Sequence, residues 1–195
     1  MTIKFKFSSL LIIALFIVSC KSKPIITDTD VNRLNFNSNE RAEYEYNEHL
    51  SKEEVTYFSK KLNVDKSEIT NEKLYVFIKS WEETTYLLGG VNKNGVDCSA
   101  LMQELYKYVY DIKLARTSVE MFSDKRFKTL KEGQTLEEGD LVFFKIKEDQ
   151  VVSHVGIYLK NNRFFGASST EGCNIASLKK NYWKNLYVGA VRLKK

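Results

Sequence analysis

The spacing of the apolar residues changes along this chain of 195 residues, and this change limits the folds it can adopt. Between about residues 51 and 122, apolar positions recur at helical spacing. From residue 141 onward, short runs of β-branched and aromatic residues alternate with polar or glycine-containing turns. Helices followed by a series of strands predict an α+β fold, with the helices packed on one antiparallel β-sheet.

The expected elements can be placed along the chain. The segment Ser51-Lys52-Glu53-Glu54 has the form of a capping box, which predicts a helix start at residue 51. Helices are expected over 51–62, 74–84, 98–109 and 116–122, and strands over 141–146, 151–159, 163–168, 173–177 and 186–193.

The first nineteen residues have the features of a processing signal. Lys4 and Lys6 precede an apolar run, 10–18, that is too short to span a bilayer as a mature helix. The run leads to Cys20, in a sequence that resembles a bacterial lipobox, which predicts a lipidated cysteine and a membrane anchor. An ordinary signal peptide or an uncleaved anchor is the alternative.

The expected organisation is therefore a lipoprotein signal peptide over 1–19, a flexible tether over 20–45 and one folded domain over 46–195. Because the residues after Cys20 are basic rather than acidic, we expect a periplasm-facing lipoprotein.

Charge and cysteine usage exclude several classes of protein. The formal net charge is +5, but lysine and glutamate are interspersed and no basic stripe alternates with aromatic residues, so nucleic-acid binding is not expected. The chain has three cysteines and two histidines, without a Cys-x-x-Cys motif or a histidine pair at ligand spacing. We expect no metal, no cofactor, no structural disulfide and a monomer.

One cysteine stands where a nucleophile would be useful. The glycine-containing segment 86–96 leads to Asp97-Cys98, and the helical pattern begins directly afterwards. A helix N-terminus presents free backbone N–H groups and the positive end of the helix dipole, which favour a thiolate over a thiol. His154, in an apolar strand, is a candidate base. The structural alternative for Cys98 is a small buried side chain, and for His154 it is a core residue. His49, the other histidine, is expected to be solvated.

Seven short motifs, taken in order, resemble the NlpC family of bacterial cell-wall cysteine peptidases, which have a compact papain-like fold. The matching segments are 86–90, 95–99, 116–118, 138–144, 153–158, 163–168 and Tyr182-Trp183 with Val191. The resemblance covers roughly residues 74 to 193. It implies that Cys98 is the nucleophile, that His154 is the general base and that the hydroxyl of Tyr86 helps to stabilise the oxyanion.

The resemblance also implies a substrate site. Asp97 and Tyr86 would hold the free amine of an L-alanine, whereas Ser99, Arg116 and Ser118 would hold the carboxylate of γ-D-glutamate. Structural alternatives exist for three of these residues. Asp97 is equally suited to an N-cap, Arg116 to a salt bridge and Tyr86 to the core.

Two positions depart from the family, the lesser being Ala100, where the family usually has glycine, and the greater being on the strand after His154. The third polar residue, commonly a histidine on the strand after the catalytic histidine, is replaced by Gly166. Glycine has no side chain to orient an imidazole, so Ser168, Ser169, a backbone carbonyl or a water would have to substitute. We expect retained but weakened chemistry.

The leading hypothesis is a lipid-anchored thiol protease that cuts peptidoglycan stem peptides between γ-D-glutamate and a diamino acid. The alternatives are a catalytically weakened peptidoglycan-binding or regulatory lipoprotein, and a thiol amidase or acyltransferase.

Overall fold

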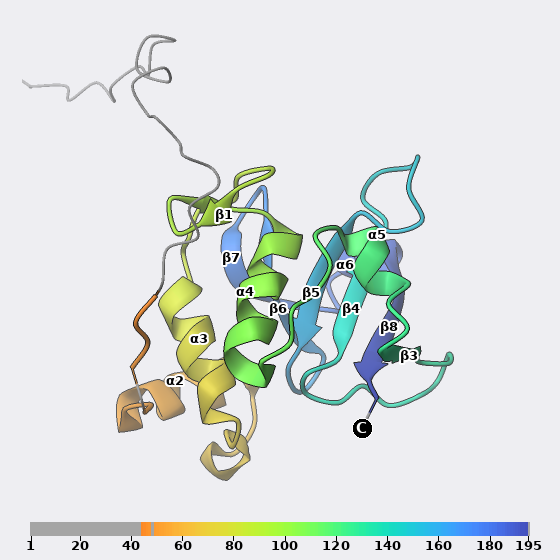
Figure 1. Ribbon diagram of the computed structural model, residues 1–195. Coiled ribbons are helices and arrows are strands. Elements are labelled where there is room, and N and C mark those ends of the chain that lie inside the picture. Colours follow the sequence, from red (N-terminus) through yellow and green to blue (C-terminus); the bar gives the residue numbers. More distant parts are fainter. Residues whose placement is uncertain (1–43, 48, 195) are drawn as a thin grey trace, which may run out of the picture. The chain divides into compact units, whose positions relative to one another are not determined.

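The computed structural model describes residues 44–47 and 49–194 of the chain (Figure 1). The expected signal peptide, Cys20 and most of the expected tether lie outside these residues. Among the described residues, no helix is long and apolar enough to cross a membrane.

The α-helices of the first half lie where the sequence predicts them. They are α2 (Lys52–Leu62), α3 (Glu72–Trp81), α4 (Cys98–Tyr110) and α5 (Ser118–Phe122), and a 3₁₀ turn that was not predicted, η1 (Lys66–Glu68), lies between α2 and α3. The predicted capping box at the start of α2 is confirmed, because Ser51 Oγ accepts from the Glu54 amide and the Glu54 carboxylate accepts from the Ser51 amide. Thr117 and Glu120 form a second capping box at α5.

The main sheet has six strands in the order β3-β8-β4-β5-β6-β7, and every neighbouring pair is antiparallel. Their bounds are β3 (Phe127–Thr129), β4 (Leu141–Phe144), β5 (His154–Tyr158), β6 (Arg163–Ser168), β7 (Gly172–Ser177) and β8 (Tyr187–Leu193). The short strands β1 (Val91–Asn92) and β2 (Gly95–Val96) form a separate hairpin. The predicted α+β class is confirmed.

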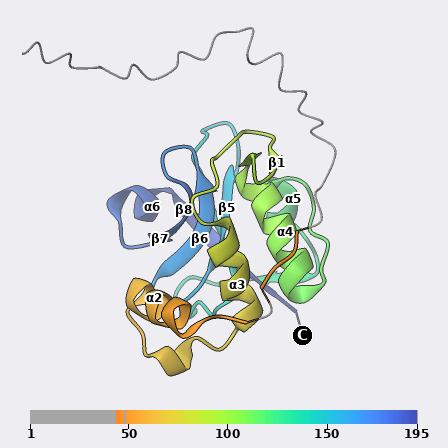
Figure 2. The same ribbon diagram turned by 90° about the vertical axis from the view of Figure 1, so that its left-hand side faces the viewer.

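Alternation along the strands divides the core between the two faces of the sheet. Val155 and Ile157 of β5 belong to the larger core, which α3 and α4 cover. Tyr158 of β5 and Phe144 of β4 belong to a smaller core on the other face, which the helix α6 (Asn181–Leu186) covers through Trp183. Figure 2 shows α6 and α4 on opposite sides of the strands.

Strands β5 and β6 separate at one end of the sheet. Their paired residues are Ile157 with Phe165 and Tyr158 with Phe164. Beyond this point β5 continues to pair with β4, up to His154, while β6 continues to pair with β7, up to Ser168. Gly166 of β6 still lies beside this part of β5, but the two strands are not paired there.

The folded part of the chain begins before the expected boundary at residue 46. Tyr46 stacks on Phe77 with ring centroids 5.6 Å apart, and its hydroxyl accepts a hydrogen bond of 3.0 Å from Trp81 Nε1. Tyr44, which falls within the expected tether, packs edge-on against Trp81 at 5.1 Å. The amide of Lys93 donates to the Tyr44 hydroxyl.

The sequence-based prediction lacks helix α6, strand β3, the β1–β2 hairpin and the 3₁₀ turn η1. Helix α6 has no side-chain capping hydrogen bond and only six residues, so it has little local signal and is held by Trp183. Strand β3 has one buried residue, Phe127, and the β1–β2 hairpin has two residues in each strand. These elements are too short for a periodicity to be recognised.

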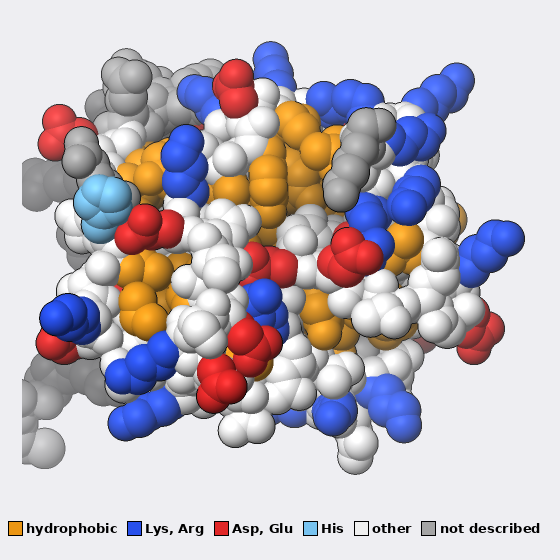
Figure 3. Space-filling model, turned by 90° about the horizontal axis from the view of Figure 1, so that it is seen from below, with side chains coloured by type: hydrophobic (Ala, Val, Ile, Leu, Met, Phe, Trp, Pro, Cys, Tyr) orange, Lys and Arg blue, Asp and Glu red, His pale blue; other side chains and the backbone are white. Residues whose placement is uncertain are grey.

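The surface of the domain carries charges of both signs. On the face seen in Figure 3, lysine and arginine side chains lie among aspartate and glutamate side chains. His49, one of the two histidines, is exposed and contacts Glu72 at 3.2 Å.

Candidate active site

Cys98 is the first residue of α4, as the sequence predicts, and only 7% of it is exposed. Asp97 is the N-cap residue, and its Oδ1 accepts a hydrogen bond of 2.7 Å from the amide of Ala100. The side chain of Cys98 contacts the backbone amide of Val155, in the part of β5 that has no pairing with β6. This contact places the thiol next to the residue that follows His154.

The ionisation of Cys98 differs from the sequence-based expectation. Burial raises the pKa of the thiol to about 11, although the backbone amides of Val155, Ser99 and Cys98 itself act in the opposite direction. The amides provide the predicted stabilisation of a thiolate, but the loss of hydration is larger and the nearby Asp97 adds to it. Contrary to the sequence-based expectation, the helix-start amides do not lower the pKa of Cys98 below that of an ordinary thiol, because burial has the larger effect.

His154 is the first residue of β5, and 4% of it is exposed. Burial lowers the pKa of its imidazole to about 4, so the ring is neutral at pH 7. Among the described residues, His154 Nε2 has no hydrogen-bond partner. Neither serine suggested by the sequence takes that place, and Ser168 Oγ instead accepts from the amide of Glu171 at 3.3 Å.

Gly166 lies directly opposite this unpartnered nitrogen. A Cβ atom built on Gly166 would be 3.7 Å from His154 Nε2 and 3.5 Å from the carbonyl oxygen of Val155. Gly166 therefore lies beside the imidazole, as the sequence-based alignment with the family expects for the third polar residue, and its position has room for a side chain. Glycine leaves the outer nitrogen of the imidazole without an orienting hydrogen bond from this position.

The loop before α4 is held by backbone contacts that require glycine. Gly89 has a φ of +78°, in the left-handed region, and its amide donates to Asp97 Oδ2 at 3.1 Å. A Cβ on Gly90 would lie 2.3 Å from the carbonyl oxygen of Gly95, so only glycine allows the two backbones to approach. The tight loop positions Tyr86, which forms a bridge with Val96.

Tyr86 is close enough to the thiol and to the N-cap carboxylate to be affected by both. Its pKa is raised, first by burial and then by the negative charges that Cys98 and Asp97 carry when ionised. The phenol therefore keeps its proton at neutral pH and can serve as a hydrogen-bond donor beside the sulfur.

Three of the predicted binding residues form one hydrogen-bonded cluster. Arg116 Nη1 and Nη2 donate to the two oxygens of Asp97 at 3.1 and 2.6 Å, and Nη1 also donates to Ser99 Oγ at 2.8 Å. Ser99 Oγ donates to Asp97 Oδ1 at 3.0 Å. Burial alone would raise the pKa of Asp97, but the hydrogen bonds from Arg116 and the Ala100 amide outweigh it and the pKa is lowered.

Asp97 is fully occupied by these contacts. With the bonds from Gly89 and Ala100, its carboxylate accepts five hydrogen bonds, whereas a carboxylate offers about four lone-pair sites. Both structural alternatives, the N-cap for Asp97 and the salt bridge for Arg116, are present in the structure. They do not exclude the binding roles, which stay predictions.

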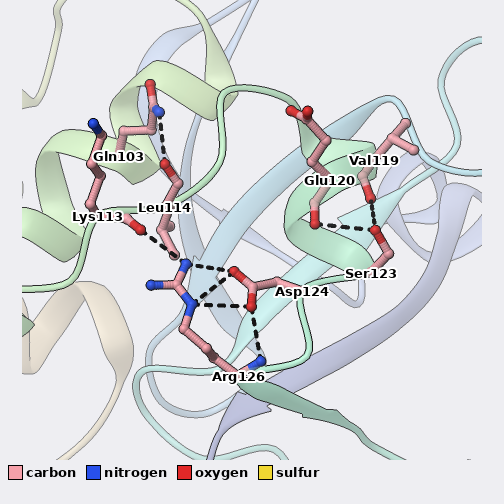
Figure 4. Close-up of polar contacts among 8 residues, drawn as sticks. All are labelled: Gln103, Lys113, Leu114, Val119, Glu120, Ser123, Asp124 and Arg126. Atoms are coloured by element: carbon pink, nitrogen blue, oxygen red, sulfur yellow. Dashed lines mark hydrogen bonds and ion pairs between the residues drawn. The ribbon is translucent and has the colours of Figure 1, made fainter.

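The segment that leads to Arg116 is fixed by two hydrogen bonds to its backbone carbonyls, at Lys113 and Leu114 (Figure 4). Gln103 Nε2, from α4, donates to the Leu114 carbonyl at 3.0 Å, and Arg126 Nη2 donates to the Lys113 carbonyl at 2.9 Å. Arg126 also binds the carboxylate of Asp124. Ser118 is buried at the first position of α5, two residues after Arg116.

The remaining cysteine and the metal-binding side chains give no second site. Cys98 and Cys173 are both buried and free, and burial raises the pKa of Cys173 to about 12. Within the described part of the chain, no group of three or more His, Cys, Asp or Glu residues could hold a metal ion.

A cysteine at the start of a helix, packed against an antiparallel sheet that carries a histidine, defines the papain-like class of folds. Solved structures agree with this assignment. A Staphylococcus aureus protein described as similar to a lipoprotein of the NLP/P60 family superposes with a TM-score of 0.55 at 24% identity, over 79% of this chain and 45% of that one. NlpC1 from Trichomonas vaginalis superposes with a TM-score of 0.53 at 26% identity, over 63% and 43%.

Within this class, the chain belongs to the NlpC/P60 family, whose model matches residues 83–192. It is 39% identical over 113 residues to a probable endopeptidase NlpC homolog of Haemophilus influenzae, covering 58% of this chain and 57% of that protein. It is 35% identical to the murein DD-endopeptidase MepS/murein LD-carboxypeptidase of Escherichia coli, with the same coverage. The chain therefore spans little more than half the length of these curated relatives.

Sequence reasoning missed two features of the site. The amide of Val155 that contacts the thiol has no sequence signal, because any residue supplies an N–H. Trp183, whose ring stacks on His154 at a centroid distance of 5.1 Å, matches a family motif, but a motif of two aromatic residues does not reveal what they contact.

Proposed function

We propose that this protein is a cell-envelope cysteine peptidase that hydrolyses peptide stems of peptidoglycan. The observation that carries the proposal is the contact between the Cys98 side chain and the amide of Val155, the residue next to a buried His154. It lies where α4 meets β5, so the proposed nucleophile is beside the backbone of the residue that follows the proposed base. The endopeptidase and murein endopeptidase names of the relatives support the reaction class and the substrate.

The ionisation of the pair defines the first chemical step. Because His154 Nε2 faces Gly166, Nδ1 is the nitrogen that we assign to the thiol. Both groups are neutral at rest, so His154 accepts the proton of Cys98 as the sulfur attacks the amide carbon. The Cys98 amide and the Tyr86 hydroxyl donate to the oxyanion that forms.

The second half of the reaction restores the pair. The imidazolium of His154 protonates the leaving amine as the C–N bond breaks, which leaves an acyl group on Cys98. The neutral imidazole then removes a proton from water as the water oxygen attacks the thioester carbonyl. The acid is released, and the thiol regains its proton from the imidazolium.

Arg116 is the group best suited to anchor a carboxylate of the substrate. Three of the hydrogen bonds of Arg116 are accounted for by Asp97 and Ser99, and its side chain is 41% exposed. A guanidinium has five N–H groups, so a carboxylate can bind without displacing Asp97. We assign γ-D-glutamate to this position, with Ser99 and Ser118 beside it, and the bond to the following diamino acid as the one cut.

Binding of an L-alanine ammonium by Asp97 and Tyr86 is the less direct part of this assignment. Asp97 already accepts five hydrogen bonds, so an ammonium would have to replace one of them. The guanidinium of Arg116, which is positively charged and donates two of them, is the strongest competitor. Tyr86 is half-buried, and its hydroxyl can both donate and accept a hydrogen bond.

The lipobox-like sequence before Cys20 supports a lipid anchor, and with it a periplasm-facing location. A thioether-linked lipid at Cys20 would keep the domain near the membrane while the intervening residues, up to Tyr44, set its reach toward the wall.

Digestion of purified muropeptides tests the function. The full chain is incubated with tetrapeptide stems that carry a free L-alanine amine, and the products are separated by chromatography and identified by mass. Cleavage after γ-D-glutamate that is abolished in Cys98→Ala is the expected result. Intact stems with the wild-type chain would contradict the peptidase, and acyl transfer to an added amine without hydrolysis would indicate an acyltransferase.

A second candidate function is peptidoglycan binding with weak or no cleavage. The absence of a hydrogen-bond partner for His154 Nε2 among the described residues favours it, because the orienting group of the family is replaced by Gly166. Cosedimentation with isolated sacculi separates the two functions. Binding that equals that of Cys98→Ala, without any released fragment, would support this candidate.

A further inference from the structure

We propose that Trp183 is a positioning residue for His154, and that ring stacking takes over the orienting role that Gly166 cannot perform. This inference rests on the proposed roles of Cys98 and His154. It concerns how the general base is held, which neither the fold nor the family assignment specifies.

The geometry of the two rings is that of a stacked pair. The ring centroids of Trp183 and His154 are 5.1 Å apart, and their planes are inclined by only 27°. The other ring in contact with the imidazole, that of Phe144, is 5.7 Å away and inclined by 53°. Trp183 therefore covers a face of the imidazole, whereas Phe144 borders it at an angle.

Trp183 is itself held in place on this face of the sheet. It is 5% exposed, and the rings of Phe144 and Phe164 pack against it at centroid distances of 4.8 and 5.1 Å, both close to edge-on. Its helix, α6, is tied to the end of β4, because the Lys145 amide donates to the Leu186 carbonyl at 2.8 Å. A ring fixed in this way can limit the movement of its neighbour.

The imidazole needs such a restraint because of its bonding pattern. The torsion that turns a histidine ring has broad energy wells, so the plane of the ring is set by its contacts. A hydrogen bond to Nε2 would set it, but Nε2 has no partner in the described part of the chain. The flat indole of Trp183 covers one face of the imidazole. It limits the imidazole to orientations in which Nδ1 points away from Gly166.

Stacking has a second consequence once the reaction begins. His154 becomes an imidazolium when it accepts the thiol proton, and the face of an indole attracts a cation. Trp183 thus stabilises the charged form of the base in a site whose burial otherwise opposes charge. An aliphatic residue of similar volume would fill the space but supply neither effect.

Two substitutions at Trp183 separate stacking from simple packing. In the full chain, Trp183→Leu is expected to lower kcat for muropeptide cleavage at least tenfold with little change in KM, whereas Trp183→Phe, which keeps a ring, should stay within about threefold. Phe164→Leu is the matched control, since it removes an aromatic contact of Trp183 in the same core without touching the imidazole. Thermal unfolding of each variant sets an assay temperature at which all are folded.

Rescue provides the decisive measurement. Gly166→Asn places an amide oxygen within reach of Nε2, because the Cβ position is 3.7 Å from that nitrogen. Added to Trp183→Leu, it should restore most of the lost kcat, while Gly166→Ala in the same background should not. Equal losses in Trp183→Leu and Phe164→Leu, or a folded Trp183→Leu chain with wild-type kcat, would overturn the proposal.

A substrate-free readout keeps this test distinct from that of the proposed function. The rate of Cys98 alkylation by iodoacetamide at pH 7, followed by peptide mass analysis, reports the thiol–imidazole pair directly. We expect at least a threefold decrease in Trp183→Leu and recovery with Gly166→Asn. If the wild-type chain cleaves no muropeptide, the peptidase fails but this decrease still supports the positioning role, and an unchanged rate refutes it.

Discussion

Arg116 and Asp97 form a bidentate ion pair at the start of the cysteine helix, with N–O distances of 3.1 and 2.6 Å. The N-cap of α4 is therefore charged, buried and tied to a loop 19 residues further along the chain. The pair fixes the first turn of the helix, on which the position of the thiol depends. It also keeps Arg116 beside the site, where it has further N–H groups to offer.

Removing the cation should destabilise the domain and change its acid sensitivity. We expect Arg116→Met to lower the free energy of unfolding by about 1–2 kcal/mol at pH 7, since it leaves a buried carboxylate with fewer donors. Because the folded-state pKa of Asp97 is lowered, this stabilisation is present above about pH 4 and is lost as the pH falls further. Urea unfolding at pH 7 and pH 3 measures both effects.

A matched surface pair serves as the control for that substitution. Lys180 contacts Glu171 at 3.6 Å with 59% and 44% of the two side chains exposed, so Lys180→Met should change stability by less than about 0.5 kcal/mol. Similar losses for Arg116→Met and Lys180→Met would show that the N-cap pair has no special contribution.

The thiol of Cys98 should react as a group of high pKa. Burial raises that pKa to about 11, so the rate of alkylation by iodoacetamide should keep rising with pH through pH 9 rather than level off near neutrality. Mass analysis of the Cys98 peptide over a pH series gives the profile. A plateau below pH 8 would indicate a preformed thiolate–imidazolium pair and contradict the neutral resting state.

The buried imidazole should make the domain less stable as the pH falls below neutrality. His154 has a pKa of about 4 in the folded state, against about 6.5 in the unfolded chain. Between these values only the unfolded chain binds the proton, so the free energy of unfolding should decrease by about 3 kcal/mol in total. The decrease should be much smaller in His154→Gln, as followed by urea unfolding from pH 7 to pH 4.

Gly166 and Gly156 should respond in opposite ways to the same substitution. A Cβ on Gly166 meets no atom closer than 3.5 Å, so Gly166→Ala should stabilise the domain by about 0.5 kcal/mol through the unfolded chain. A Cβ on Gly156 would lie 2.7 Å from the Phe165 carbonyl oxygen, so Gly156→Ala should destabilise it by more than about 1 kcal/mol. Thermal unfolding compares them, and a clear loss for Gly166→Ala would show that the position is filled.

The residues before α2 should contribute to stability rather than act as a free tether. Tyr46→Ala removes a ring stacked on Phe77 and the acceptor of the Trp81 indole N–H, so we expect a loss of about 2–3 kcal/mol. Tyr46→Phe, which removes the hydroxyl alone, should lose about 1 kcal/mol. A Tyr46→Ala chain as stable as the wild type would place the start of the folded unit after residue 46.

The family match, the fold class and the identity of most elements could be predicted because each depends on local patterns. Within a few residues, the capping box at Ser51 and Glu54 and the apolar spacing of α3 and α4 indicate helices. The β-branched residues of β5 and the aromatic residues of β6 indicate strands in the same way. The cysteine at the start of a helix follows in the same way from the Asp97-Cys98 segment. Short elements such as α6 and β3 have no such pattern and could not be found.

What the sequence determined by itself was which residue types stand where: a thiol at a helix start, an imidazole in a strand and a glycine at the orienting position. What only the tertiary structure decided was their ionisation and their partners. The pKa of Cys98 depends on how completely packing removes water, and the saturation of Asp97 depends on a cation 19 residues away. The imidazole ring of His154 stacks on the indole ring of Trp183, which comes from a separate helix on that face of the sheet. Contacts of this kind between distant segments are set by packing in three dimensions.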